Sequence, residues 1–146
     1  MKKYYNIFPV GVVKKEGEKA SIEIYEKYED ALLGLDEFSH ITVCYWFHKN
    51  DAPEKRNVMQ VHPRKNPNNP LTGVFATHSP IRPNLMALTT CKILSIEGKI
   101  ISIDKIDAFD GSPVIDIKCY VPSSVPESEV KSPEWIQKST TRAKSR

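Results

Sequence analysis

The chain has 146 residues, 40% of them hydrophobic and 27% charged, with a net charge of +3. This length and composition are typical of one globular domain with a single core. No stretch approaches the roughly 18 apolar residues of a membrane span, and residues 1–15 lack the apolar centre and cleavage site of a secretory signal.

Apolar and polar residues alternate through most of the first half of the chain, which predicts strands. We expect strands at residues 6–15, 20–26 and 39–49, and a short helix at 28–38. Residues 51–72 hold four prolines and four asparagines, which predicts an irregular excursion.

The second half continues the strand pattern. We expect a short strand at 73–76, a hairpin of 85–97 with 99–107 about Gly98, a turn at 109–113 and a strand at 114–122. Residues 132–138 predict a short helix capped by Ser132, followed by a mobile tail.

Many short strands with little helix predict a mostly β fold: a small antiparallel β-barrel with short helical additions. A Rossmann fold is disfavoured because no GxGxxG motif follows a strand and strands do not alternate with helices. We expect residues 1–122 to form the barrel and residues 123–146 to form a C-terminal extension with a basic tail.

Basic residues are concentrated in two segments. Residues 49–82 contain six Lys or Arg against two Asp or Glu, and residues 122–146 contain five against three. Such segments favour a phosphate-bearing partner, although a merely solvated loop explains the charge equally well.

The three cysteines lie far apart, which argues against a disulfide framework and favours a cytoplasmic protein. Each of Cys44, Cys91 and Cys119 sits in an apolar run, so we expect buried thiols. No CxxC or HExxH motif is present, and we expect no metal site.

Residues 40–48 predict a strand with His40 and His48 at opposite ends of one face, too far apart to share a ligand. His40 suits a structural role, whereas His48 lies where the strand opens into the basic excursion and is the better site residue.

Residues 114–121 predict a strand with two different faces. Ile115, Ile117, Cys119 and Val121 should face the core, and Val114, Asp116, Lys118 and Tyr120 should lie opposite them. The polar set forms either a cross-strand charge ladder or the lining of a pocket.

The stretch GVFATHSPIRPN, residues 73–84, carries two prolines that stiffen a polar loop. With the ring of Phe75 and the donors of Arg82 and Asn84, it suits a ligand that has a flat ring and polar edges. A rigid connecting loop that caps neighbouring strands is the alternative.

That stretch, followed by DGSPVIDIKCYVP, resembles the TrmO (TsaA-like) family, as do PVGVVK and GLDEFSHITVCYWFH upstream. The resemblance covers residues 8–122. It implies a non-Rossmann β-barrel that binds S-adenosylmethionine, usually as a homodimer. It also implies methylation of N6 of threonylcarbamoyladenosine beside the tRNA anticodon.

The resemblance also implies roles for matching residues. Those implied to contact the cofactor are Phe47, His48, Phe75, Ala76, Thr77, His78, Ser79, Pro80, Arg82, Asn84, Leu88, Asp104, Lys105, Ile106 and Asp107. Those implied to face the RNA or the substrate are Lys55, Arg56, Arg64, Lys65, Asp110 and Lys118. The group that accepts the N6 proton stays open among Asp116, Tyr120 and His48.

The sequence departs from the family pattern at several positions. His78 replaces an arginine, Ile81 a polar or aromatic residue, Leu85 a proline, Ala87 a glycine and Cys119 a proline, and the family's N-terminal PRQ segment is absent. Two alternatives therefore stay open: a non-catalytic barrel that senses S-adenosylmethionine or a nucleotide, and an RNA-binding adaptor.

Overall fold

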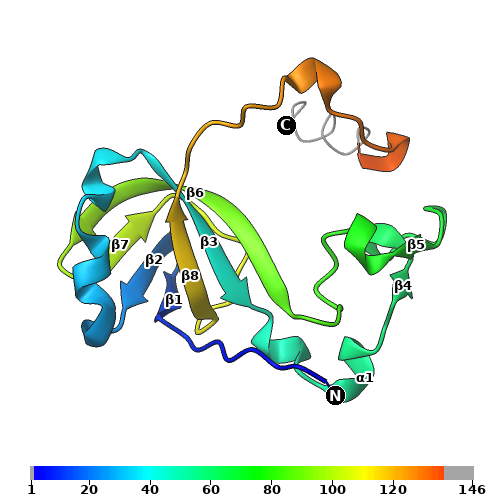
Figure 1. The fold of residues 1–146 in the computed structure, drawn as a ribbon, viewed down its shortest axis with the longest axis horizontal. Helices are drawn as coiled ribbons and strands as arrows, with labels where there is room; N and C mark the ends of the chain where they lie inside the picture. Colours follow the sequence, from blue (N-terminus) through cyan, green and yellow to red (C-terminus); the bar gives the residue numbers. More distant parts are fainter. Residues whose placement is uncertain (1, 137–146) are drawn as a thin grey trace.

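Six antiparallel strands close into a barrel in the computed structural model, which describes residues 2–136 (Figure 1). Their order around the barrel is β1 (Gly11–Glu16), β2 (Lys19–Ile24), β7 (Ile100–Ile103), β6 (Met86–Glu97), β3 (His40–Trp46) and β8 (Pro113–Cys119). β8 pairs with β1 and so leaves no open edge. The predicted mostly β barrel is confirmed.

Inward-facing aliphatic side chains fill the barrel because successive residues of a strand point to opposite faces. On β3, Ile41 and Val43 are fully buried, whereas His40 and Thr42 are half-exposed, as the alternation predicts. The other fully buried residues of the core cluster are Val13, Ile22, Cys91, Ile101 and Val114.

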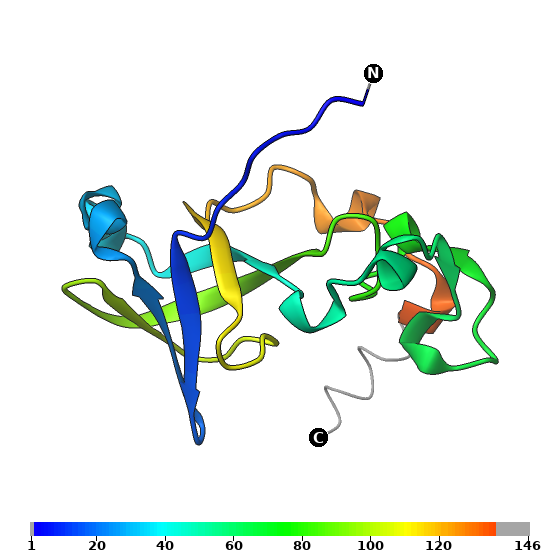
Figure 2. The same ribbon diagram turned by 90° about the horizontal axis from the view of Figure 1, so that it is seen from below.

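The long connection between β3 and β6 forms a separate small unit, which we call the excursion (residues 51–76). It contains α1 (Pro53–Arg56) and a two-stranded sheet of β4 (Gln60–Val61) and β5 (Thr72–Gly73). Figure 1 shows this sheet beside the barrel, and Figure 2 shows residues before β1 running away from the body.

Short 3-10 helices make up most of the remaining regular structure: η1 (Glu26–Leu32), η2 (Leu35–Glu37), η3 (His48–Asn50), η4 (Pro63–Lys65), η5 (Val74–Ala76) and η6 (Glu127–Glu129). No helix among the described residues is long and apolar enough to cross a membrane.

Several predicted elements differ from the structure. The helix at 28–38 is split into η1 and η2 because Gly34 adopts a φ of 85° between them. The first strand begins at Gly11 rather than residue 6, after Pro9, which has no amide to donate.

The strand expected at 73–76 is wrong beyond Gly73. Residues Val74–Ala76 form η5, and the amide and hydroxyl of Thr77 both donate to the Val74 carbonyl, at 3.2 and 2.9 Å. These local hydrogen bonds close a tight turn and outweigh the β-propensity of Val and Phe.

The predicted inward position of Val121 is wrong, since it lies beyond the end of β8 and is exposed. The predicted faces of β8 are also wrong at its start, because the register shifts between Cys44 and Tyr45 of β3. Cys44 pairs with Asp116 but Tyr45 pairs with Val114, so Ile115 is an extra residue in a β-bulge. The bulge reverses the alternation: Val114 is fully buried and Ile115 lines an outer groove.

The C-terminal extension crosses from β8 toward the excursion (Figure 1). Helical residues begin at Glu134, one residue after the first helical position expected at Pro133, and the amide of Ile136 donates to the carbonyl of Pro133 at 3.1 Å. The rest of that helix and the tail expected to be mobile lie outside the described residues.

All three cysteines are free thiols, but they differ in environment. Cys44 and Cys91 are buried as predicted, whereas Cys119 is exposed at the end of β8, so the prediction was wrong there. Burial, followed by the Asp104 carboxylate, raises the pKa of Cys91 to about 11. Burial and then Asp116 also raise the pKa of Cys44.

Substitution of Gly11 should destabilise the barrel, because a Cβ there would lie 2.5 Å from the Glu23 carbonyl oxygen of β2. We expect Gly11→Ala to lower the free energy of unfolding by about 1–3 kcal/mol, measured by urea denaturation. Gly73→Ala is the control, since its Cβ would meet only the Met59 carbonyl at 4.0 Å. Equal stability of both variants would contradict this view of the β1–β2 contact.

Native protein should present one reactive thiol, that of Cys119. A raised pKa means less thiolate, so Cys44 and Cys91 should stay protonated at about pH 8 as well as shielded. We expect Ellman's reagent to label one thiol quickly in wild-type protein and none quickly in Cys119→Ser. Fast labelling that persists in Cys119→Ser would show that a buried thiol opens to solvent.

Candidate functional site

An aromatic and cationic cluster lies where β3 runs into η3. The amide of Phe47 donates to the Leu85 carbonyl at 2.8 Å, and its ring meets that of Tyr45 edge-on at 5.9 Å. The Lys49 ammonium lies 4.1 Å from the centre of the Phe109 ring. The sequence analysis missed Lys49 and Phe109 because only barrel closure brings these distant residues together.

His48 presents an unsatisfied polar atom within this cluster. Its Nδ1 is buried and has no hydrogen-bond partner among the described residues. Leaving such an atom unpaired costs about 1–3 kcal/mol, so it marks a position where a ligand or water is expected to bind. The neighbouring Phe109 ring is 58% exposed and offers an aromatic face.

The loop of residues 77–84 is held by its own side chains. One Arg82 nitrogen, Nη1, donates to the carbonyls of Thr77 and Ser79 at 3.1 and 3.3 Å. The Ser79 amide donates to the Thr77 hydroxyl, and the Ile81 amide donates to the Ser79 hydroxyl, both at 3.2 Å. With Pro80 and Pro83, these bonds make the loop a stiff wall.

Arg56 of α1 braces this loop from outside. Its Nε donates to the Pro83 carbonyl at 2.8 Å, and Nη2 donates to the Asn84 side chain at 3.5 Å. The guanidinium also lies 5.5 Å from the Trp46 ring and forms an ion pair with Asp51 at 3.4 Å. Through these contacts Arg56 stabilises the loop, in addition to the contact with RNA that the sequence predicts for it.

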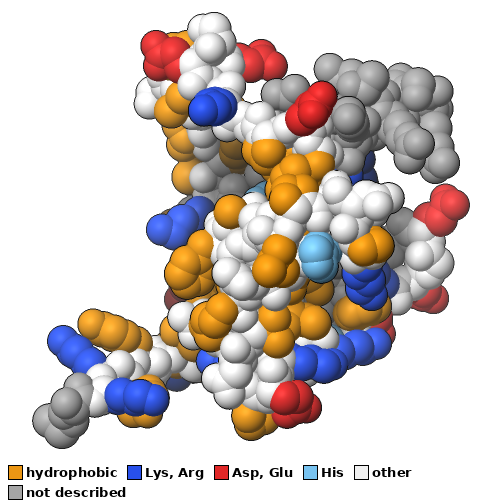
Figure 3. Space-filling model, turned by 90° about the vertical axis from the view of Figure 1, so that its right-hand side faces the viewer, with side chains coloured by type: hydrophobic (Ala, Val, Ile, Leu, Met, Phe, Trp, Pro, Cys, Tyr) orange, Lys and Arg blue, Asp and Glu red, His pale blue; other side chains and the backbone are white. Residues whose placement is uncertain are grey.

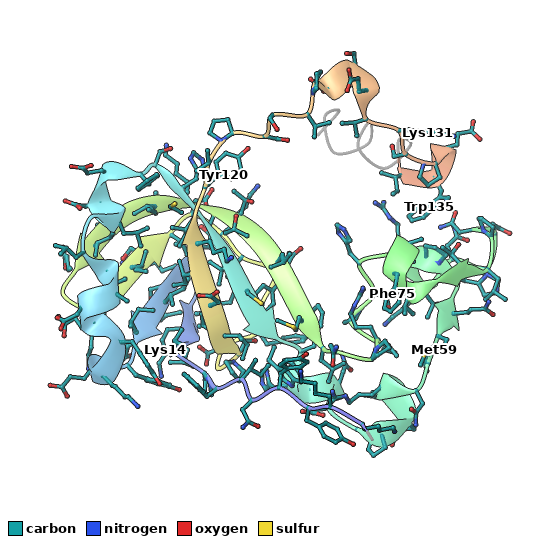
Figure 4. All side chains as sticks on the ribbon, viewed as in Figure 1. Lys14, Met59, Phe75, Tyr120, Lys131 and Trp135 are labelled. Atoms are coloured by element: carbon teal, nitrogen blue, oxygen red, sulfur yellow. The ribbon has the colours of Figure 1, made fainter. Side chains whose placement is uncertain are left out.

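The first part of the predicted loop lies apart from the barrel end. Phe75 is 84% exposed on the excursion, away from the barrel strands (Figure 4). Ala76 and His78 are exposed too, whereas Thr77 is buried. Phe75 therefore presents most of its ring on the surface, where another molecule could contact it.

Residues 104–107 lie in the β7–β8 loop and not on the strand that the sequence analysis expected, because β7 ends at Ile103. Ile106 is buried in the core, so only its backbone could face a ligand. Burial raises the pKa of Tyr45, a hydrogen bond with Thr89 lowers it, and the Asp107 carboxylate raises it further, which puts Asp107 near the cluster.

Two acidic side chains of this region accept hydrogen bonds from backbone amides. Desolvation raises the pKa of Asp104, but hydrogen bonds from the amides of Lys92 and Lys105 outweigh this effect and lower it overall. Asp110 accepts a hydrogen bond from the Lys15 amide at 2.8 Å and so ties its turn to β1.

A groove of about 410 Å³ lies on the outer face of the barrel. Its lining is mostly apolar: Asn6, Ile7, Phe8, Thr42, Cys44, Met86, Leu88, Ile115, Asp116 and Lys118. Neither Asp116 nor Lys118 forms an ion pair with a described residue. Of the two interpretations of this face, the pocket is therefore supported and the charge ladder is not.

The three candidates for proton acceptor lie in different places. Asp116 pairs with Cys44 of β3 and lines the groove, whereas His48 lies past the end of β3, in η3. Tyr120 lies at the far end of β3, where its amide donates to the His40 carbonyl and the two rings are 6.1 Å apart. His40 is a satisfied structural residue, as predicted, since its Nδ1 lies 2.7 Å from the Ser39 hydroxyl.

The predicted RNA-facing cations lie on the excursion. Arg64 and Lys65 are exposed on η4, both with φ near +60°, and Lys55 donates to the Asn50 side chain at 3.2 Å. No cluster of three or more His, Cys, Asp or Glu that could hold a metal occurs within residues 2–136.

A family profile described as the tRNA-methyltransferase O N-terminal domain matches residues 5–124. The chain belongs to this family. It is 47% identical over 141 residues to a Pyrococcus horikoshii protein named "probable S-adenosyl-L-methionine-binding protein", and the match covers 97% of the chain and 96% of that protein.

The family also includes longer proteins. Mouse tRNA (adenine(37)-N6)-methyltransferase is 42% identical over 98 residues, which are 67% of the chain and 22% of the mouse protein. The crystal structure of TrmO from Pseudomonas aeruginosa superposes with a TM-score of 0.70 at 23% identity, which shows the shared fold. That match covers 92% of the chain, which spans only 63% of the TrmO chain.

Two departures from the family pattern prove to be core positions. Leu85 is fully buried, and Ala87 is buried in β6 opposite Tyr45, without a positive φ. Neither changes a surface that a ligand would touch. The structure agrees with the absence of the PRQ segment, because only a two-residue turn links Glu16 of β1 to Lys19 of β2.

Loss of the Arg82 side chain should loosen the loop without unfolding the barrel. In Arg82→Ala, the Thr77 and Ser79 carbonyls lose a donor, so we expect faster hydrogen–deuterium exchange in peptides covering residues 77–84. Lys14→Ala, an exposed cation on β1, is the control and should exchange like wild type. Unchanged exchange in Arg82→Ala would mean that the prolines alone hold the loop.

Proposed function

We propose that this protein is an S-adenosylmethionine-dependent methyltransferase that acts on N6 of threonylcarbamoyladenosine beside the tRNA anticodon. The observation that carries the proposal is the family match over residues 5–124, together with a barrel end whose groups suit the cofactor. The names of its relatives, a methyl-donor-binding protein and a tRNA adenine methyltransferase, point the same way.

The groups of the barrel end fit S-adenosylmethionine. The unpaired Nδ1 of His48 offers a hydrogen bond to a bound molecule, and the exposed face of Phe109 suits an adenine ring or a sulfonium. Phe47, Asp107 and the stiff loop at Arg82 would complete the walls. The cofactor supplies a methyl group on positively charged sulfur.

The protein's own contribution is to position the reactants and to accept a proton. Positioning alone supplies up to roughly 7–11 kcal/mol in favourable cases. The N6 nitrogen gains a methyl group and loses its proton, and acid–base help with that proton is worth about 10²–10⁴ in rate. His48 is the candidate acceptor that lies in the cluster itself.

The exposed apolar side chains of β6 support a homodimer as part of this proposal. Leu88 and Leu94 are 73% and 60% exposed on this strand. A second copy would cover such a surface and could bring another chain's Phe75 or Tyr120 to the cluster. Three free thiols are consistent with action in the cytoplasm.

Core positions for Leu85 and Ala87 weaken the case for a non-catalytic sensor, because these departures do not alter the proposed pocket. The missing PRQ segment is the observation that keeps this second candidate open. A sensor would bind the cofactor with intact His48 and transfer no methyl group.

The test is mass spectrometry of tRNA nucleosides from a strain of the source organism that lacks this gene. We expect N6-methylation of threonylcarbamoyladenosine to be lost and to return with a plasmid-borne wild-type gene. Unchanged methylation in the deletion strain would overturn the proposed substrate.

A matched pair of histidine variants in the same strain tests the site. His48→Ala should restore little methylation and should bind S-adenosylmethionine at least about tenfold more weakly by calorimetry. His40→Ala, at the start of β3 and so at the opposite end of that strand from His48, should restore methylation. Full rescue by both variants would place the site elsewhere.

A further inference from the structure

An extended arm of residues 2–8 precedes the barrel and takes no part in its core. Tyr4 and Tyr5 are 80% and 78% exposed, and Lys2 and Lys3 are exposed beside them. No backbone hydrogen bond joins residues 2–9 to another described residue, and the first such bond runs from the Val10 amide to the Val114 carbonyl. Figures 2 and 3 show the arm projecting from the body.

The root of the arm is anchored, but its tip is free. The Phe8 ring stacks on Tyr28 of η1, with ring centres 6.0 Å apart and planes 14° apart. Residues 6–8 also line the outer groove with Asp116 and Lys118. An extended chain spans about 10 Å from Phe8 to Tyr5, so the two tyrosines stand near one end of this groove.

The chemistry of the tip suits single-stranded nucleic acid. Two cations and two aromatic rings lie within four consecutive residues, Lys-Lys-Tyr-Tyr, and the Lys3 ammonium lies 5.5 Å from the centre of the Tyr5 ring. Unpaired bases stack on such rings regardless of sequence, and the lysines meet the phosphates between them. Neither ring stabilises the barrel, which leaves both available to a partner.

We propose that this arm is an RNA-binding element: Tyr4 and Tyr5 stack on unpaired nucleotides of the substrate tRNA, and Lys2 and Lys3 pair with its phosphates. The inference rests on the proposed function, because it assumes a tRNA substrate with an unpaired loop. A second copy of the chain could also cover the tyrosines, but two identical arms would bring four like charges together, which favours a polyanion.

The test uses fluorescence anisotropy with the whole protein and two labelled RNAs: an anticodon stem–loop, and a blunt duplex of the same stem. We expect the double variant Tyr4→Ala/Tyr5→Ala to bind the stem–loop about fivefold or more weakly than wild type, and to bind the duplex equally well. Tyr4→Phe/Tyr5→Phe keeps both rings and should bind like wild type. Tyr25→Ala, an exposed tyrosine at the start of η1, is the control.

The lysines give an independent readout. The measured quantity is the slope of the logarithm of stem–loop affinity against the logarithm of salt concentration. Lys2→Gln/Lys3→Gln should make this slope shallower by about 1.4, since each phosphate contact to a single strand contributes about 0.7. An unchanged salt dependence would overturn the phosphate pairing.

Other outcomes separate the arm from the proposed function. Unchanged stem–loop affinity of the tyrosine-to-alanine variant, or equal loss with the duplex, would overturn stacking on unpaired bases. A shift of that variant to a smaller species in sedimentation, at unchanged RNA affinity, would assign the arm to a second copy. Wild-type protein that binds the stem–loop through the arm but transfers no methyl group would overturn only the proposed function.

Discussion

Closure of the barrel depends on a short contact between its first and last strands. β1 and β8 pair through only Gly11 with Val114 and Val12 with Pro113. Hydrogen bonds on either side extend this seam, from the Val10 amide to Val114 and from the Val13 amide to Ser112. The seam removes the last free edges. Gly11 also pairs with β2, and that contact needs a glycine because the Glu23 carbonyl lies where a Cβ would stand.

The candidate site is a consequence of this closure. Because β8 ends the circuit beside β3, the turn before β8 carries Phe109 to Lys49, in η3 just past the end of β3. The loop before β6 is stiffened by Arg82 and is held in place by Arg56 from α1. A cofactor would therefore meet a largely prearranged wall, which limits the ordering that binding requires.

The same closure leaves the outer face of the barrel unevenly covered. The β-bulge at Ile115 turns Val114 into the core and leaves Asp116 and Lys118 outside, over an apolar groove. Residues 6–8, at the root of the arm, line this groove, and the tip of the arm carries exposed tyrosines and lysines. The tyrosines and lysines of the arm therefore lie on the same side of the molecule as this groove.

The sequence by itself determined the fold class, most strands and the family, since period-two alternation and the motifs around GVFATHSPIRPN and DGSP are local patterns. It predicted β3 and the hairpin about Gly98, because each depends on neighbours within a few residues. Only the tertiary structure decided which residues of β8 face the core, where the chain turns at Val74, and that Cys119 is exposed. Bulges, long-range hydrogen bonds and contacts such as Lys49 with Phe109 join residues far apart in the chain, and no local pattern encodes which of them meet.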